Sequence, residues 1–448
     1  MADHFSLAQH LQNAATEHPA APALLYDGKI WTFVELLAEC QALAEQIGQG
    51  PQPLVKLADT IQLAHHAYAC SLKNRPFWPV APRASNCFYG SKGSRYFYTP
   101  GTRISFSVRS KPLPNTISAL TDVALIISTS GSEGQPRAVL LGNVQLDSAA
   151  AASNKCLPLA PGDLWLNCLP LYHIGGQAIL WRCARAAAGV LLHEGYNVDA
   201  VARDLQRHPV THISLVPAML ARLVEQKVKP PSTLRVSLIG GAALSRTLYD
   251  KAMTAGWPLY PSYGMSETSA QFATFKPGDG AWHEGMVGQP MPNHEIRINH
   301  DGRIVVRGPQ IMLGYLQGGG IDRDGWLTTG DLGNLDANGR LSVIGRADDM
   351  LISGGRNVHP LEIESCLAAC PGVSDVAVTG LPDPVWGNLI VALIVGTSGT
   401  NALLDHARQH LPNAALPRKI VFLESLPRNA AGKLERAALR RLANAPAA

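Results

Sequence analysis

The chain has 448 residues and a mass of 47.8 kDa, more than one hydrophobic core usually supports, so we expect a large domain and a smaller one. Its composition, 46% hydrophobic and 16% charged, excludes a disordered protein. A formal net charge of +4 without Lys/Arg blocks gives no indication of a nucleic-acid partner.

The N-terminus and the cysteines indicate a soluble cytoplasmic protein. The chain does not open with a basic segment followed by an apolar one, and no apolar run reaches the roughly 18 residues of a membrane span. The eight cysteines are scattered. Cys366 and Cys370 are four residues apart, but no second pair completes a zinc site, so we interpret the cysteines as small buried hydrophobic residues.

The first part of the chain alternates helical segments with short β-branched runs. Thr32 and Glu35 form a predicted capping box for a helix that reaches Ile47. Further helices are expected at Val144–Ala152, Val198–Gln206 and Ala218–Glu225, and strands at Val123–Ile127, His212–Val216 and Arg235–Ile239. This alternation predicts α/β layers with parallel strands. Residues 73–120 look irregular and receive no assignment.

Antiparallel hairpins are expected from about Glu295, where period-two runs are separated by the turn pairs Asp301-Gly302 and Asn338-Gly339. After Arg346 the pattern predicts an α+β unit, with a helix near Pro360–Ala369, strands near Val376–Val378 and Leu389–Val395, and a basic helical tail. The predicted fold is therefore α/β, with a large multi-layer N-terminal domain at 1–346 that has a β-rich end, and a small mobile lid domain at 347–448.

The strongest local motif runs from Ser128 to Arg137, Ser-Thr-Ser-Gly-Ser-Glu-Gly-Gln-Pro-Arg, directly after a predicted strand. Its small hydroxyl residues and glycines let backbone N–H groups approach a polyphosphate, whose charge Arg137 can balance. The spacing is not that of a Walker loop. On local sequence alone, a flexible turn is the alternative.

This loop resembles the phosphate loop of the adenylate-forming acyl-CoA synthetases, adenylation domains and luciferases. Six further matches follow in the family's order, at Leu169–His173, Ile239–Ala243, Tyr263–Thr268, Thr329–Asp331, Gly345–Asp348 and Ala431–Arg436. Ordered matches spread over about 300 residues are far more specific than any one of them. The resemblance implies an acid–thiol ligase that uses ATP, Mg²⁺ and coenzyme A and proceeds through an acyl-adenylate.

The reaction joins two anions, so it needs cationic and metal neutralisation of the phosphate charge. By the resemblance, Lys433 is the catalytic lysine of adenylation, Glu267 holds magnesium, Thr268 touches the α-phosphate and His173 lies near the acyl pocket. Local sequence alone also allows a solvated lysine, a surface glutamate and a core histidine.

The resemblance also assigns the nucleotide contacts. Asp331 would accept both ribose hydroxyls, because a carboxylate offers two acceptor oxygens to two donors. Tyr263 would stack on adenine, and Arg346 would lie beside the ribose and phosphate. The full set expected to bind ATP or AMP is Ser128, Thr129, Ser130, Gly131, Ser132, Gly134, Arg137, Gly241, Ala242, Tyr263, Gly264, Met265, Thr268, Asp331 and Arg346.

Two features are implied for the second half-reaction. Asp348 falls where the family places the hinge about which the small domain rotates. Gly354 and Gly355 would line the path of the pantetheine arm of coenzyme A, since glycine permits close approach to the backbone. A plain β-turn is the alternative for this pair.

The segments Leu169–Arg182 and Thr211–Arg222 are similar to the o-succinylbenzoate–CoA ligases of menaquinone synthesis. In that interpretation Arg182 pairs with a second substrate carboxylate, a use for which guanidinium is well shaped, and Gly240 joins His173 at the acyl pocket. An arginine that only packs at a helix edge is the alternative.

Several alternatives stay open. The acid could be another aryl or dicarboxylic acid or a fatty acid, and the thiol could belong to a carrier protein. A homodimer is one option for the assembly. Glu133 and Arg137 stand where the family commonly has threonine and lysine, and residues 73–120 lack the family's usual strand–helix unit. Glu133 and Arg137 motivate a third alternative, an ATP-binding or acyl-binding protein without turnover.

Overall fold

The computed structural model describes residues 4–50, 52–56, 58–81, 87–89, 95–97, 120–129, 137–428, 432 and 434–445. The α-helices in this part of the chain are α1 (Leu7–Glu17), α2 (Phe33–Ile47), α3 (Thr60–Leu72), α4 (Asn143–Cys156), α5 (Ile174–Ala186), α6 (Val198–Arg207), α7 (Pro217–Glu225), α8 (Arg246–Thr254), α9 (Pro360–Ala368), α10 (Thr400–His410) and α11 (Arg436–Asn444). None of them is long and apolar enough to cross a membrane.

The largest sheet has a parallel half and an antiparallel half. The parallel neighbours are, in order, β1 (Pro22–Tyr26), β10 (Gly189–Leu192), β9 (Leu164–Asn167), β11 (His212–Leu215), β12 (Val236–Ile239) and β13 (Leu259–Met265), with β2 (Lys29–Thr32) antiparallel at the edge. Beyond β13 the sheet continues antiparallel through β14 (Ala270–Thr274), β15 (Met286–Pro290), β20 (Leu341–Arg346), β19 (Leu327–Leu335), β17 (Arg303–Arg307) and β16 (Glu295–Ile298). The predictions of parallel layers and later hairpins are both confirmed.

A second sheet carries the phosphate-loop hairpin. Its order is β18 (Gly314–Tyr315), β8 (Arg137–Gly142), β7 (Val123–Thr129), β4 (Phe77–Pro79) and β3 (Leu54–Lys56). A separate pair, β5 (Cys87–Tyr89) and β6 (Arg95–Phe97), is antiparallel. Residues 73–120 received no assignment from the sequence, so β4 was missed. This strand pairs in parallel with β7 through Phe77 and Leu125.

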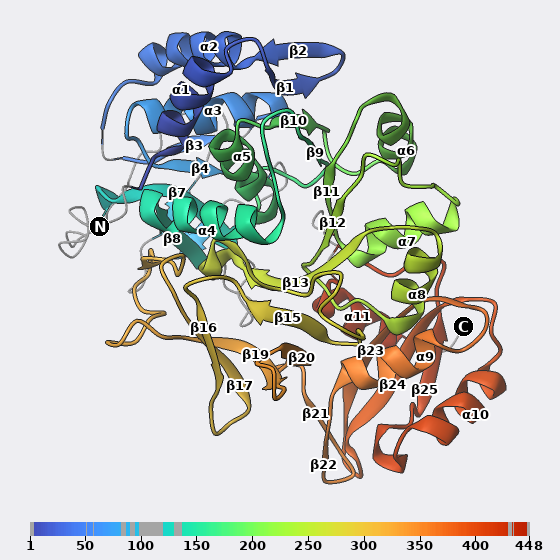
Figure 1. Cartoon of the computed structure of the whole chain (residues 1–448). Helices are drawn as coiled ribbons and strands as arrows, with labels where there is room; N and C mark the ends of the chain where they lie inside the picture. The colour runs from blue at the N-terminus through green and yellow to red at the C-terminus, as the bar shows by residue number, and fades with distance from the viewer. Residues whose placement is uncertain are drawn as a thin grey trace.

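Helices cover both faces of the parallel strands, with α1, α4 and α5 on one side and α6, α7 and α8 on the other (Figure 1). These strands are therefore largely buried, and most of their buried residues are apolar. On β9, Trp165 belongs to the core beneath α5, whereas its neighbours Leu164 and Leu166 belong to the core beneath α6 and α7. The carboxyl ends of the strands consequently meet at one edge, where ligands bind in open parallel sheets.

The helix predicted after Thr32 is present as α2. The Thr32 side chain accepts the backbone N–H of Glu35, and the Glu35 side chain accepts the backbone N–H of Thr32. These two hydrogen bonds satisfy donors that every helix start leaves free, so the four-residue motif was sufficient to predict the first turn.

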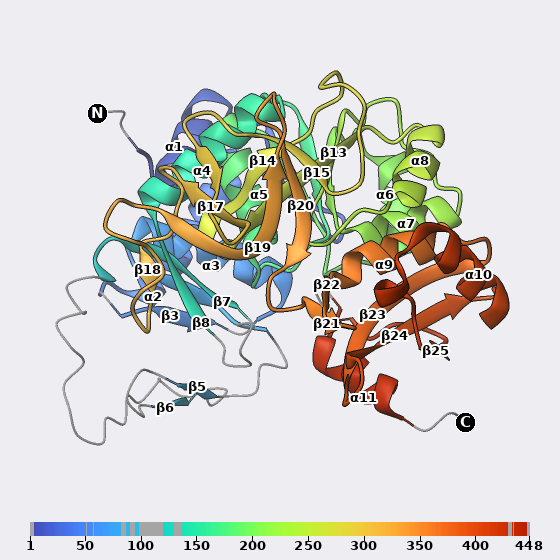
Figure 2. The ribbon, with the colours of Figure 1, turned by 90° about the horizontal axis from the view of Figure 1, so that it is seen from below.

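The C-terminal part forms a small α/β domain with its own core. A sheet in the order β22 (Arg356–Val358), β21 (Leu351–Ser353), β24 (Gly387–Gly396) and β23 (Val373–Asp383) has β25 (Lys419–Phe422) beside β24, and α9, α10 and α11 pack on it. Figure 2 shows this domain and the β7–β8 hairpin on either side of β19 and β20. The exact boundary after Arg346 stays a prediction.

Candidate active site

The phosphate loop joins β7 to β8, and the strand ends on either side of it are described. Ser128 and Thr129 end β7, and Thr129 pairs across the hairpin with Arg137. The Trp78 indole N–H donates to the Ser128 hydroxyl at 2.9 Å, which fixes the entrance to the loop. The predicted contacts Ser130, Gly131, Ser132 and Gly134, together with Glu133, lie outside the described residues.

Glu267 lies in a short 3-10 turn that directly follows β13. The Tyr315 hydroxyl donates to its Oε1 at 2.9 Å, and burial raises the pKa of Tyr315 to about 12, with Glu267 adding to the effect. Tyr315 therefore stays protonated and keeps donating at neutral pH. Among the described residues no hydrogen bond to Oε2 of Glu267 occurs, which leaves that oxygen for a cation.

Tyr315 also connects the two halves of the phosphate site. The Arg137 guanidinium lies 5.2 Å from the centroid of the Tyr315 ring, so one tyrosine contacts both the hairpin cation and the candidate magnesium ligand. Sequence reasoning missed this residue, as it missed Trp78. Tyr315 belongs to β18 and Trp78 to β4, both in the second sheet, and neither residue lies in a motif on which the family resemblance rests.

Thr268 and Gly264 shape the turn around Glu267. The Thr268 hydroxyl is fully buried and accepts the backbone N–H of Met265 at 3.0 Å, with the Ala270 carbonyl 2.8 Å away as its acceptor. In this conformation the hydroxyl holds the turn rather than facing outward. A Cβ on Gly264 would lie 1.9 Å from the Ala270 carbonyl oxygen, so only glycine fits there.

A connected polar cluster brings together four residues from the predicted nucleotide and hinge motifs. The Tyr263 hydroxyl donates to Oδ2 of Asp331 at 2.8 Å, and Nη1 of Arg346 lies 3.6 Å from Oδ1 of the same carboxylate. Arg346 donates to both oxygens of Asp348, at 2.9 and 3.1 Å. The pairing of β19 with β20 sets this geometry, because Asp331 and Arg346 are register partners.

The pKa values in this cluster follow from burial and pairing. Burial raises the pKa of Tyr263 well above 10, and the Asp331 carboxylate raises it further, so the phenol remains a donor. Burial acts to raise the pKa of Asp348, but the hydrogen bonds from Arg346 outweigh it and hold that pKa below its usual value. Asp348 is therefore ionised and paired with Arg346 at neutral pH, while Tyr263 stays a neutral donor.

The predicted residues after β12 lie at the carboxyl end of the sheet next to β13. Gly241 has a φ of +80°, which favours glycine, and a Cβ on Gly240 would lie 2.9 Å from the Ser262 hydroxyl oxygen. The register of β12 against β13 places Gly240, Gly241 and Ala242 alongside the start of the Tyr263 motif.

His173 and Arg182 both belong to α5 but not to the same end of it. His173 is the N-cap, with its ring 4.7 Å from that of Tyr172. Nine residues at about 1.5 Å each put Arg182 roughly 13 Å further along the helix. The two residues therefore lie at different levels of α5, and their joint contact with the acid stays a prediction.

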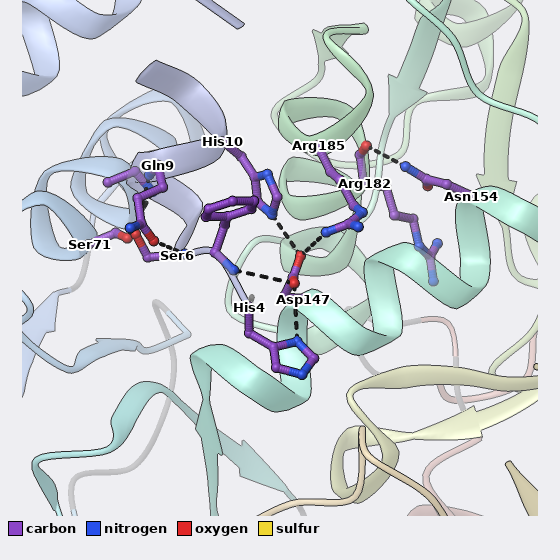
Figure 3. Close-up of polar contacts among 11 residues, drawn as sticks. His4, Ser6, Gln9, His10, Ser71, Asp147, Asn154, Arg182 and Arg185 are labelled. Carbon is purple, nitrogen blue, oxygen red and sulfur yellow. Dashed lines mark hydrogen bonds and ion pairs between the residues drawn. The ribbon is translucent and has the colours of Figure 1, made fainter. Parts of the chain in front are cut away.

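Arg182 is a buried cation that meets no acidic side chain in the described part of the chain. It is 3% exposed, its guanidinium carbon lies 5.4 Å from the centroid of the Trp165 ring, and its Nε has no hydrogen-bond partner there. Burial lowers its pKa to about 10, so it is charged at neutral pH. Figure 3 shows Arg182 extending away from Asp147, which Arg185 binds instead.

Gly354 and Gly355 form the turn between β21 and β22, with φ values of +57° and +75°. The Gly354 N–H donates to the Trp386 carbonyl at 2.9 Å, and a Cβ on Gly354 would lie 3.1 Å from the Trp386 ring. The turn is thus required by local packing, so its glycines do not by themselves indicate a path for a thiol.

Lys433 lies outside the described residues, whereas the neighbouring Gly432 is described. A Cβ on Gly432 would lie 2.6 Å from Cγ2 of Val216, which follows the carboxyl end of β11. Arg428 donates to the Gly432 carbonyl at 3.0 Å and to both oxygens of Asp375 at 2.9 Å. Gly432 therefore lies beside the carboxyl end of β11.

Comparisons with known proteins agree with this arrangement. Residues 81–316 match the AMP-binding enzyme family and residues 362–433 match the AMP-binding enzyme C-terminal domain. A 2-succinylbenzoate–CoA ligase from Bacillus subtilis is 31% identical over 96% of this chain and 97% of the relative. Another from Bacillus cereus is 36% identical over 72% of this chain and 71% of the relative.

Solved structures give the same result. The o-succinylbenzoate CoA synthetase from Bacillus subtilis in complex with its acyl-adenylate intermediate has a TM-score of 0.81 at 29% identity, with 96% of this chain and 97% of that one covered. ATP-bound MatB from Rhodopseudomonas palustris has a TM-score of 0.81 at 21% identity over 98% and 99% of the two chains, which shows a shared fold alone.

Proposed function

The chain belongs to the AMP-binding enzyme family and is an ATP-dependent acid–CoA ligase, and from this premise we propose that its acid is 2-succinylbenzoate. That compound has two carboxylates, so one remains ionised when the other is activated. The Bacillus subtilis and Bacillus cereus relatives act on it by name. The product would then serve menaquinone synthesis, in the cytoplasm, where ATP and coenzyme A are available.

The observation that carries this choice of acid is the unpaired charge of Arg182. A buried guanidinium without an acidic partner is costly, and a substrate carboxylate would supply the missing charge through two hydrogen bonds. A fatty acid or a simple aryl monoacid would leave the cation uncompensated. Those acids are therefore poorer candidates than an acid with a second carboxylate.

For the first half-reaction we assign positioning and charge neutralisation to residues of this chain. Asp331 would accept the ribose hydroxyls, exchanging its present contacts with Tyr263 and Arg346 for the nucleotide. Arg137 and Lys433 would offset the charge that develops as the acid attacks the α-phosphate and pyrophosphate leaves. These assignments follow the family's motif order.

Magnesium fits the site because the free Oε2 of Glu267 is a hard oxygen ligand beside the phosphate hairpin. When bound with ATP, the ion supplies charge neutralisation on the phosphates. A structure of the Bacillus subtilis synthetase contains ATP and a magnesium ion. Tyr315 would hold Glu267 in one orientation by its hydrogen bond to Oε1.

For the second half-reaction we propose that rotation about Asp348 brings the C-terminal domain into a second position, in which Gly354 and Gly355 face the thiol. The rotation would have to break the Arg346–Asp348 pair or move the two residues together. In either case the contact of Arg346 with the ribose would change. Coenzyme A then attacks the acyl-adenylate, giving acyl-CoA and AMP. A carrier protein as acceptor and a homodimeric assembly stay predictions.

The test measures pyrophosphate release with Mg²⁺ and ATP across a panel of acids that includes 2-succinylbenzoate, with and without coenzyme A. Wild type, Lys433→Ala and the control Lys229→Ala, an exposed lysine between α7 and β12, are compared. We expect release that depends on 2-succinylbenzoate, collapses only in Lys433→Ala and yields acyl-CoA only with coenzyme A. Faster release with a monocarboxylic acid would contradict the proposed substrate.

A further inference from the structure

Three metal-ligating side chains meet on the outer side of the C-terminal domain, apart from the nucleotide cluster. Cys366 belongs to α9, and His406 and His410 belong to α10, which lies at the periphery of the molecule in both views (Figures 1 and 2). One ligand atom from each residue lies within 4.8 Å of the other two. Among the described residues, this is the group that combines a thiol with two imidazoles.

The two histidines are held in the way that metal-binding histidines are. Their i, i+4 spacing puts both rings on one face of α10, with ring centroids 4.5 Å apart, and a His-x3-His spacing is typical of zinc sites. His406 uses Nε2 for the Cys366 carbonyl at 3.0 Å, and His410 uses Nδ1 for the His406 carbonyl at 2.8 Å. Each ring that donates there keeps a lone pair on its other nitrogen, so backbone carbonyls select the tautomers that can bind a metal.

The surroundings leave the three ligands free. Cys366 and Cys370 are both free thiols, but Cys366 is half-buried, whereas the sulfur of Cys370 is buried 3.6 Å from the Ser398 hydroxyl. Arg408, the nearest cation on α10 by sequence, is paired with Asp405 at 2.7 Å. Because His410 is exposed, water can reach a fourth coordination position.

We propose that Cys366, His406 and His410 bind a zinc-class divalent cation that clamps α9 to α10. Zinc bonds of about 2.3 Å to sulfur and about 2.0 Å to nitrogen require ligand atoms roughly 3.5 Å apart, which side-chain adjustment from the present separation can reach. Binding converts the Cys366 thiol into a thiolate and releases one proton to solvent. Sequence spacing alone could not find the site, because the thiol and the first histidine are 40 residues apart.

The clamp would act on a helix that touches the large domain. The Ser365 hydroxyl, beside Cys366 on α9, hydrogen-bonds the Glu284 carboxylate of the N-terminal region. A cation that fixes α9 to α10 would therefore make the small domain more rigid, so that it rotates as one unit. None of the three ligands belongs to the nucleotide or acyl sites, so adenylation itself should not need the cation.

The test uses untagged, chelator-treated, full-length protein titrated with Co²⁺. We expect one equivalent per chain, with a near-ultraviolet thiolate-to-cobalt charge-transfer band that Zn²⁺ removes by displacement. Cys366→Ser should abolish the band and His410→Ala should weaken binding about 10-fold or more. Cys156→Ser, which changes another half-buried thiol of the described residues, is the matched control and should keep the band.

Two results would overturn the proposal: no saturable charge-transfer band in wild type, or a band that survives in Cys366→Ser. A second measurement needs no variant. Zn²⁺ should protect Cys366 from alkylation, read by peptide mass spectrometry, while leaving Cys156 as reactive as before. Equal alkylation of Cys366 with and without Zn²⁺ would also exclude the site.

Discussion

The nucleotide cluster, formed by Tyr263, Asp331, Arg346 and Asp348, pairs its charges, whereas Arg182 on α5 is a charge without an acidic partner among the described residues. Around Asp331 every charge has a partner, since Tyr263 and Arg346 both contact it and Arg346 also binds Asp348. Arg182 is more deeply buried and faces an aromatic ring instead of an acid. The difference indicates that the nucleotide must exchange existing contacts, whereas the acid can supply a contact that the protein lacks.

The largest expected effect comes from breaking the paired cluster at Asp331. Asp331→Ala removes the acceptor of the buried Tyr263 phenol and one partner of Arg346, as well as the proposed ribose contact. Hydrogen bonds to a charged group contribute about 1.5–3 kcal/mol, so kcat/KM for ATP should fall on the order of 10–100-fold. Steady-state pyrophosphate release measures this, and an unchanged KM for ATP would remove Asp331 from the nucleotide site.

Two neighbouring arginines of α5 differ in their partners: Arg185 pairs with buried Asp147, whereas Arg182 pairs with no acid among the described residues (Figure 3). Arg185→Met should lower the free energy of unfolding by about 1–3 kcal/mol, since it leaves a buried carboxylate with less compensation. Arg182→Met removes an uncompensated cation, so stability should be unchanged or higher by about 1 kcal/mol. Denaturant unfolding compares the two, and a larger loss for Arg182→Met would contradict the unpaired state.

The stability of the protein should depend on pH through His212, which lies beside the Trp165 ring that Arg182 faces. Burial lowers the pKa of His212, which stacks on the Trp165 ring, from 6.5 to about 4. The unfolded chain therefore binds a proton between those pH values that the native protein does not, and the native state loses stability as the pH falls from about 6.5 towards about 4. His212→Gln should flatten this part of the stability profile, measured by thermal unfolding; a parallel profile would show that other groups cause it.

The smallest effect is expected at the hinge pair. Arg346 and Asp348 are partly exposed, so Asp348→Asn should change the free energy of unfolding by about 0–1 kcal/mol. If Asp348 restrains the rotation, the variant should alter the rate of acyl-CoA formation more than that of pyrophosphate release. Single-turnover assays of the two steps separate them, and equal changes in both rates would exclude a hinge role.

How far the sequence could predict the molecule depends on whether a feature is local. Turn residues and short motifs determine the capping box of α2, the β16–β17 hairpin and the two motifs that contain Asp331 and Arg346. The sequence could therefore predict them. The Tyr315–Glu267 and Trp78–Ser128 hydrogen bonds were not, because they join residues 48 and 50 positions apart. Ser130–Gly134 and Lys433 lie outside the described residues, so their roles stay predictions.

The pairing of Arg182 with a second substrate carboxylate is tested most directly by comparing 2-succinylbenzoate with 4-oxo-4-phenylbutanoate, the same molecule without its ring carboxylate, in wild type and Arg182→Met. A charged pair of this kind contributes about 1.5–3 kcal/mol, so wild type should prefer 2-succinylbenzoate by roughly 10-fold or more in kcat/KM. The variant should lose most of that preference while keeping its activity on the monoacid. An equal preference in both proteins would contradict the pairing of Arg182 with the second carboxylate.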